Sequence, residues 1–300
     1  MNLATLVPLA LKASIVLIIF VLGLNVRPQD AAYLFRRPGK LMRSLLSMNV
    51  VMPLFAAGVV AAFELHPAVE IALIALAVSP IPPLLPRKSL KAGGGASYTF
   101  GLLVAAALLA IVFVPVAVDL LGRAFGRPAR IWPAAIAQLV LLTVIGPLAA
   151  GMVVRRVAPG FSERMAKPVS LGATILLLAI ALPVLMTAWP AIVSLIGNGT
   201  VVAIAAFILV GLVAGHLLGG PDPDDRTVLA FCTAFRHPGI AIAIAGANFP
   251  GQTLVSAAVL LYLLVSAVVS FLILAWRRRQ QARIAGAAKL RNRVQGKMKT

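Results

Sequence analysis

Acidic side chains are scarce in this chain, where eight Asp and Glu residues stand against 27 Lys and Arg residues. Only 12% of the 300 residues are charged, whereas about a quarter are charged in an ordinary soluble domain. Hydrophobic residues make up 61% of the chain, and the mean hydropathy is +1.02. The shortage of charge excludes an ordinary soluble domain and indicates a protein that crosses a membrane several times.

Cysteine is nearly absent as well, since Cys232 is the only one. One thiol cannot form a disulfide within the chain, which excludes a disulfide scaffold. Residues 1–26 have a spanning-length apolar run and no small-residue cleavage site after it, so we expect a first membrane helix and not a cleaved signal peptide. The net charge of +19 does not indicate nucleic-acid binding, because nearly all basic residues lie between apolar runs or in the last 24 residues.

Long apolar runs are abundant. About 20 residues cross ~30 Å of hydrocarbon, and nine such runs can be counted. We expect an all-α polytopic membrane protein with nine transmembrane helices near residues 4–26, 42–63, 68–91, 96–121, 132–154, 167–187, 199–219, 227–249 and 253–276. Residues 1–276 would form a single transmembrane domain, and residues 277–300 would form a basic cytoplasmic tail that touches anionic lipid.

Basic residues cluster in segments that would share one face of the membrane. They are Arg27, Arg36, Arg37, Lys40 and Arg43, then Arg87, Lys88 and Lys91, then Arg155, Arg156, Arg164 and Lys167, and finally the tail. The opposite ends carry Glu64, Glu70 and Asp119, although Arg123, Arg127 and Arg130 lie there too. We expect the protein in the cell (inner) membrane, and the positive-inside rule then places its N-terminus outside and its C-terminus in the cytoplasm.

Two of the nine runs are interrupted near their middles by proline. Residues 79–83 (SPIPP) interrupt one, and residues 236–239 (RHPG) interrupt the other. Proline lacks an N–H and clashes with the preceding turn, so the helix must open there. An opened backbone survives in lipid only where it is buried in protein or lines a cavity. Such a matched pair predicts the substrate site of a secondary transporter.

The interrupted runs are five spans apart, so they cross the membrane in opposite directions. Spans 1–4 then correspond to spans 6–9, and the fifth has no counterpart. We therefore expect an inverted repeat in which two broken helices cross at the middle of the membrane.

Three segments carry a resemblance to the bile acid:sodium symporters and their bacterial relatives. Residues 18–54, which begin IIFVLGLNVRPQ, are similar to the first conserved helix of that family, its cytoplasmic loop and the next helix. Residues 65–103 and 226–250 resemble its two broken helices. The resemblance implies a transporter and not an enzyme, with a core domain, a panel domain and a substrate cavity between them.

The chain departs from that family where sodium would be held. The resemblance implies two glycines and then hydroxyl and amide side chains after Pro80, where this chain reads IPPLLP. It also implies a glutamate, a glutamine and an asparagine where Cys232, Arg236 and His237 stand. Thiol, guanidinium and imidazole groups are poor ligands for a hard cation. We therefore expect no cofactor, and sodium only where main-chain carbonyls at the breaks could hold it.

Arg236 lies about nine residues into its run, which is ~14 Å along a helix and near the bilayer midplane. A charge at that depth costs ~3 kcal/mol, and no acidic residue lies at mid-depth in any run. The side chain could bind a carboxylate or sulfonate, or it could cap carbonyls of the break. Both interpretations stay open on the sequence.

We expect the substrate-binding residues to be Arg236, His237, Cys232, Pro82 and Pro83. His237 either takes part in proton coupling or donates to a carbonyl at the break. Cys232, four residues before Arg236 on the same helical face, either lines the cavity or is a small buried hydrophobe. The basic residues 87, 88 and 91 either extend to cytoplasmic water or form a funnel that attracts an anion.

The leading hypothesis is a secondary active transporter that moves a small organic anion by alternating access, with the bilayer and that anion as its partners. Asp222, Asp224 and Asp225 lie in one cytoplasmic loop and could instead belong to a membrane enzyme acting on a lipid diphosphate. A loop that starts the following helix is the simpler interpretation of these aspartates. A non-transporting sensor with the same fold is a third hypothesis.

Overall fold

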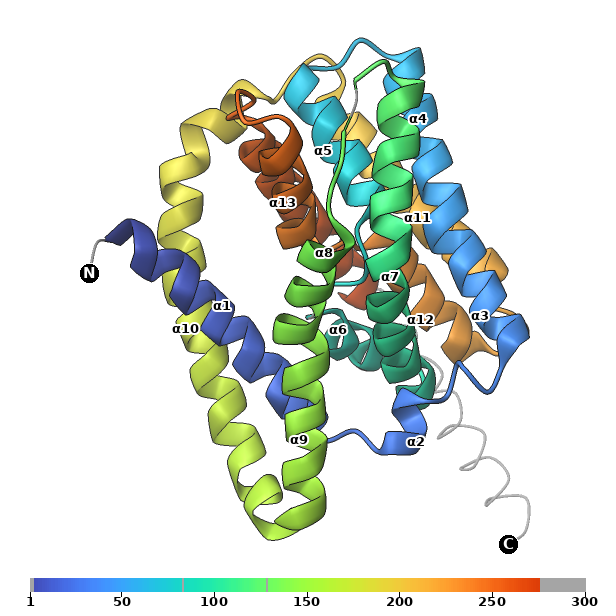
Figure 1. Ribbon diagram of the computed structural model, residues 1–300, viewed down its shortest axis with the longest axis vertical. Helices are drawn as coiled ribbons and strands as arrows, with labels where there is room; N and C mark the ends of the chain where they lie inside the picture. Colours follow the sequence, from blue (N-terminus) through green and yellow to red (C-terminus); the bar gives the residue numbers. More distant parts are fainter. Residues whose placement is uncertain (1–2, 83, 128, 276–300) are drawn as a thin grey trace, which may run out of the picture.

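Figure 1 shows a computed structural model in which residues 3–82, 84–127 and 129–275 are described. Pro83 and the predicted tail at 277–300 lie outside the described residues. Every regular element in the described part is a helix, which confirms an all-α protein. The helices are α1 (Leu3–Gly23), α2 (Pro28–Ala31), α3 (Pro38–Leu45), η1 (Leu46–Val51), α4 (Met52–Ala62), α5 (Pro67–Val78), α6 (Leu85–Lys91), α7 (Ala96–Ala124), α8 (Pro133–Val140), η2 (Leu141–Ile145), α9 (Gly146–Val157), α10 (Pro159–Ser194), α11 (Thr200–Leu218), α12 (Pro223–Ala234), α13 (Pro238–Asn248) and a last helix, Val255–Ala275.

Eight helical stretches in the described part are long and apolar enough to cross a membrane. The protein is therefore polytopic, but helix length alone does not confirm the predicted count of nine. The run at 68–91 contains α5 and α6, which have 12 and 7 residues and are each too short to span. The proline-rich segment between them divides this run.

The sixth predicted span, 167–187, is too short at both ends. The corresponding helix, α10, runs for 36 residues with Pro168, Pro183 and Pro190 inside it. Prolines are tolerated within membrane helices because neighbouring groups can satisfy the freed carbonyls. Only 6% of the most apolar part of α10 is buried, so most of this helix is available to lipid.

The helices fall into two groups by their contacts. On the left of Figure 1, α1 packs against α9 and α10. The other group holds both interrupted runs together with α3, α4, α7 and α11. A small apolar cluster of Ile19, Leu22, Val26, Phe100 and Leu148 connects α1 and α9 to the start of α7, apart from the main core. The predicted inverted repeat stays a prediction.

Glycine brings two helix pairs into very close contact. A Cβ on Gly211 or Gly215 of α11 would lie 2.6 Å from the Ala234 Cα or 2.4 Å from the Leu229 carbonyl oxygen of α12. A Cβ on Gly23 of α1 would lie 2.3 Å from the Leu148 carbonyl oxygen of α9. Small residues allow such approach between membrane helices, where packing replaces the hydrophobic effect as the driving force.

Substituting Gly215 with alanine tests the α11–α12 contact. We expect Gly215→Ala to destabilise the protein by about 1–3 kcal/mol, because the new methyl group overlaps main-chain atoms that cannot move aside. Thermal unfolding of the purified protein in detergent measures the change. Gly172→Ala in α10 is the control, since nothing lies within 4 Å of its added Cβ. An unchanged melting temperature for Gly215→Ala would show that the two helices are not tightly packed.

Candidate functional site

The first interruption separates α5 from α6. α5 ends at Val78, and Ser79 follows in an extended conformation with φ −71° and ψ 146°. Pro80 and Pro82 cannot donate to the preceding turn, so the chain stays open until α6 begins at Leu85. The sequence-based prediction of a break at this place is therefore confirmed for its described residues.

The second interruption lies at Phe235–His237, slightly earlier than the predicted 236–239. α12 ends at Ala234, and α13 begins at Pro238, so Pro238 and Gly239 are helical. The prediction was wrong here because proline was read only as a helix breaker. At the first position of a helix its missing N–H has no intrahelical partner to lose, and its fixed φ suits the helix.

The two interruptions meet. The His237 main-chain N–H donates to the Pro80 carbonyl oxygen at 2.9 Å. Above and below this point, α5 contacts α13 and α6 contacts α12 (Figure 1). That pairing is expected of two interrupted helices that run in opposite directions. We call the place where residues 79–82 and 84 meet residues 235–237 the crossing.

Arg236 lies at the centre of the crossing and is 1% exposed. Its Nη1 donates to the Ser79 carbonyl oxygen at 3.2 Å, and its Nη2 donates to the Met48 carbonyl oxygen. Both Nη atoms therefore bind main-chain oxygens, as in the interpretation of Arg236 as a cap on open carbonyls. The guanidinium connects the first interruption, the second interruption and η1.

The Met48 carbonyl is available because of the local helix geometry. Met48 lies in η1, a π-helical segment in which a carbonyl accepts from the residue five positions on. That residue is Pro53, which has no N–H. The carbonyl thus has no main-chain donor in this register, and Arg236 supplies one. The second π segment, η2, is likewise followed within two residues by a proline, Pro147.

Tyr262 of the last helix completes the crossing, and the sequence-based prediction missed it. Its hydroxyl accepts from the Arg236 main-chain N–H at 2.7 Å and donates to the Ala234 carbonyl oxygen at 3.1 Å. It therefore satisfies groups left open where α12 ends. A tyrosine inside an otherwise apolar run was the available signal, because a buried hydroxyl needs hydrogen-bond partners.

His237 caps α13. Its Nδ1 accepts from the Ile240 main-chain N–H at 3.3 Å, so in the neutral ring the proton is on Nε2. The described residues offer no hydrogen-bond partner to this buried Nε2 or to the buried Nε of Arg236. Two buried N–H donors next to each other in the chain therefore lack an acceptor.

Of the remaining predicted site residues, Pro82 and Cys232 lie in or next to the crossing. Pro82 is half-buried in the first interruption, and Pro83 lies outside the described residues. Cys232 is a free thiol, 1% exposed, in the last turn of α12. The argument that placed it on the helical face of Arg236 does not hold, because α12 ends before Arg236.

Two basic residues of α6 point into the protein. Arg87 donates to Ser170 Oγ at 2.9 Å and to Thr174 Oγ1 at 3.3 Å, both on α10. Lys88 donates to Ser270 Oγ at 3.4 Å, and its Nζ lies 5.3 Å from the centre of the Phe235 ring in the second interruption. Arg87 and Lys88 therefore hydrogen-bond to neighbouring helices, whereas Lys91 is exposed, and the funnel that attracts an anion stays a prediction.

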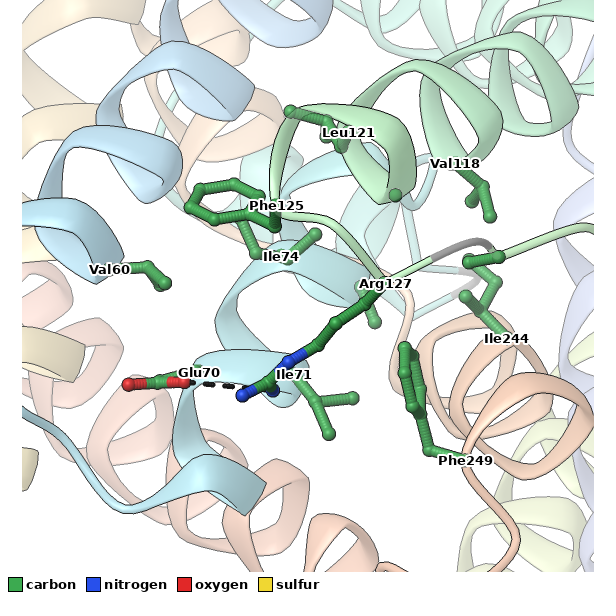
Figure 2. Close-up of a pocket in the computed structure, with 13 residues that line it drawn as sticks. Val60, Glu70, Ile71, Ile74, Val118, Leu121, Phe125, Arg127, Ile244 and Phe249 are labelled. Carbon is green, nitrogen blue, oxygen red and sulfur yellow. Dashed lines mark ion pairs between the residues drawn. The ribbon is translucent and has the colours of Figure 1, made fainter.

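A cavity of about 210 Å³ lies beside the crossing between α5, α7 and α13. Figure 2 shows Arg127 extending across it toward Glu70, with the two charged groups 3.9 Å apart. Ile74, Ile244 and Phe249 give it a largely apolar lining. Another lining residue, Ala75, accepts a hydrogen bond from Ser79, so the cavity ends one helical turn from the crossing.

Comparison with known proteins now bears on this geometry. The family model of the sodium bile acid symporter family matches residues 13–195, which is more than half of the chain. The chain belongs to the sodium bile acid symporter family. No curated protein matches it. The family consists of transporters, so the crossing belongs to a protein of the membrane-transporter class.

This symporter-family chain uses its aspartates to build structure. Asp222 caps α12 by accepting from the Asp224 main-chain N–H at 2.9 Å. Asp225 is 4% exposed and forms an ion pair with Lys40 of α3, whose Nζ also donates to the Tyr33 hydroxyl at 3.1 Å. The three predicted loop aspartates therefore belong to the start of α12, and one of them fastens α12 to α3.

Asp225→Asn tests this ion pair. We expect a loss of about 1–3 kcal/mol in stability, because a partly buried Lys40 would lose its counter-charge. Asp222→Asn is the matched control, since asparagine caps a helix as well as aspartate. Melting temperatures in detergent compare the two variants, and equal values would contradict a stabilising role for the ion pair.

Proposed function

We propose that the chain carries a small organic anion across the membrane by alternating access and binds it at the crossing. The observation that carries the proposal is the pair of buried donors without an acceptor, Arg236 Nε and His237 Nε2. A buried polar group left unpaired costs about 1–3 kcal/mol. The oxygens of a carboxylate or sulfonate would satisfy both donors and bring a negative charge to the guanidinium.

The surroundings suit such a ligand. Pro82 and Cys232 would contact its apolar part, and Lys88 adds a positive charge near Phe235. α6 and α13 begin beside the crossing, and helix N-termini favour anions. Family membership supports transport, because the sodium bile acid symporter family consists of transporters.

The distribution of charged residues supports one orientation of the protein in the membrane. We propose that the protein lies in the inner membrane of the cell. The end bearing Glu70 and Arg127 would then face outward, and the end bearing Lys40 would face the cytoplasm. The N-terminus is then outside and the C-terminus inside. The apolar cavity under Arg127 becomes an outer vestibule that ends one turn from the bound anion, and the ion pair with Glu70 lies across it.

Substitution of His237 tests the anion site with little effect on the fold. His237→Ser keeps an oxygen that can cap α13 but removes the Nε2 donor. We expect organic-anion affinity to fall roughly 10-fold or more, as for a lost hydrogen bond to a charged group. Ligand-induced thermal stabilisation across a panel of carboxylates and sulfonates identifies the ligand and measures the change.

The chain provides a control in His66, which precedes Pro67 and also caps its helix, α5, through Nδ1; that atom accepts from the Ala68 main-chain N–H at 3.1 Å. His66→Ser removes a capping histidine away from the crossing, so we expect anion affinity to stay unchanged. Equal losses in both variants would make the effect one of helix capping. No stabilisation of the wild type by any anion would refute the proposed function.

A further inference from the structure

We propose that the Arg236 guanidinium is a tethered cation, fixed where a carrier built on interrupted helices would bind a mobile coupling ion. The inference deepens the proposed function and rests on it in one respect, that the chain is a carrier. It assigns transport by this chain to a class that needs no dissolved metal cation at the crossing.

Arg236 binds the kind of atom that would coordinate a metal cation, the main-chain carbonyl oxygen. Carbonyl oxygens of unwound segments and half-helix C-termini are the groups that coordinate sodium in such carriers. Here the Ser79 oxygen at the end of α5 and the Met48 oxygen in η1 accept from the guanidinium. Neither oxygen comes from the segment that carries Arg236. One cation thus joins three separate segments, which is what a metal ion would do at this place.

The charge at the crossing also disfavours a sodium ion there. α5 and α12 both end at the crossing, and a helix C-terminus carries roughly −0.5 of an elementary charge. α6 and α13 begin at the same place, and each N-terminus carries a positive partial charge of similar size, so the four helix ends roughly cancel and Arg236 leaves the crossing net positive. A sodium ion approaching the same oxygens would meet a guanidinium already bound to them, and the like charges would repel.

Several acidic side chains in the described part of the chain have partners away from the crossing. Asp225 pairs with Lys40, Glu70 with Arg127, and Asp119 with Arg123. Asp30 accepts from the Ser97 hydroxyl at 2.6 Å, and Asp222 caps α12. None of these carboxylates is bonded to the crossing, where a hard cation would want one.

A fixed cation has a functional consequence. A mobile ion couples transport to its own gradient because it binds on one side and leaves on the other, whereas Arg236 stays in the protein. Anion movement would then follow the anion gradient and the membrane potential and would not depend on sodium. Because only the two Nη atoms are engaged, the Nε donor stays available to the anion.

Chemical rescue tests the inference on the intact chain. Arg236→Ala removes the cation and leaves its space, so we expect the melting temperature to fall by about 5–10 °C. Guanidinium chloride at concentrations far below denaturing ones should then raise the melting temperature of this variant in a saturable way. Urea, a neutral molecule of similar shape, is the matched probe and should not. Rescue by urea equal to that by guanidinium, or no rescue by either, would overturn the proposal.

A second comparison holds even where the alanine variant does not fold. Arg236→Lys keeps a positive charge, and Arg236→Met has a similar length without one. We expect the lysine variant to be the more stable of the two, and the reverse order would refute a role for charge. The wild type should melt at the same temperature in sodium chloride and in choline chloride. Specific stabilisation by sodium would contradict the inference directly.

These measurements separate the inference from the proposed function, because none of them uses an organic anion. Stability that follows the predicted order while no anion binds would retain the tethered cation and refute the anion carrier. Anion binding that requires sodium would retain the anion carrier and refute the tethered cation.

Discussion

The structure depends on satisfying main-chain groups that prolines have opened inside an apolar protein. A helix interrupted in hydrocarbon leaves carbonyls without donors, and each such group is costly when unpaired. At the crossing, Arg236 donates to two of these oxygens, Tyr262 to a third and the His237 N–H to a fourth. The interruptions persist because each is completed by groups from elsewhere in the chain.

Much of this architecture could be predicted from the sequence, because apolar runs and prolines are local signals. They gave the class of protein and the approximate places of both interruptions. They failed where proline begins a helix, at Pro238, and where it lies inside one, in α10. In α10 the outcome depends on whether neighbouring groups satisfy the freed carbonyls, and the local sequence does not contain that information. At Pro238 it depends on where the next helix begins, because a proline at the first helical position breaks nothing.

The partners of Arg236 could not be predicted from the sequence. Its acceptors are main-chain carbonyls 157 and 188 residues away, and a carbonyl has no signature in sequence because every residue has one. The Lys40–Asp225 pair, separated by 185 residues, was hidden for a related reason, since Asp225 sits among two other aspartates. The regular spacing of Gly211, Gly215 and Gly219, in contrast, was a usable sign of the close α11–α12 contact.

In the alternating access proposed above, the hydrogen bonds between α6 and α10 would have to break and re-form as the two helix groups move. Arg87 is bound there by Ser170 and Thr174, which lie one helical turn apart. Both acceptors are neutral hydroxyls, so parting them from the guanidinium exchanges protein hydrogen bonds for bonds to water at a cost of only a few kcal/mol. A carboxylate at either place would bind the arginine more tightly and, in that proposed mechanism, slow each transport cycle. The neutral hydroxyls would let the contact between α6 and α10 open thermally and close again on the same two partners.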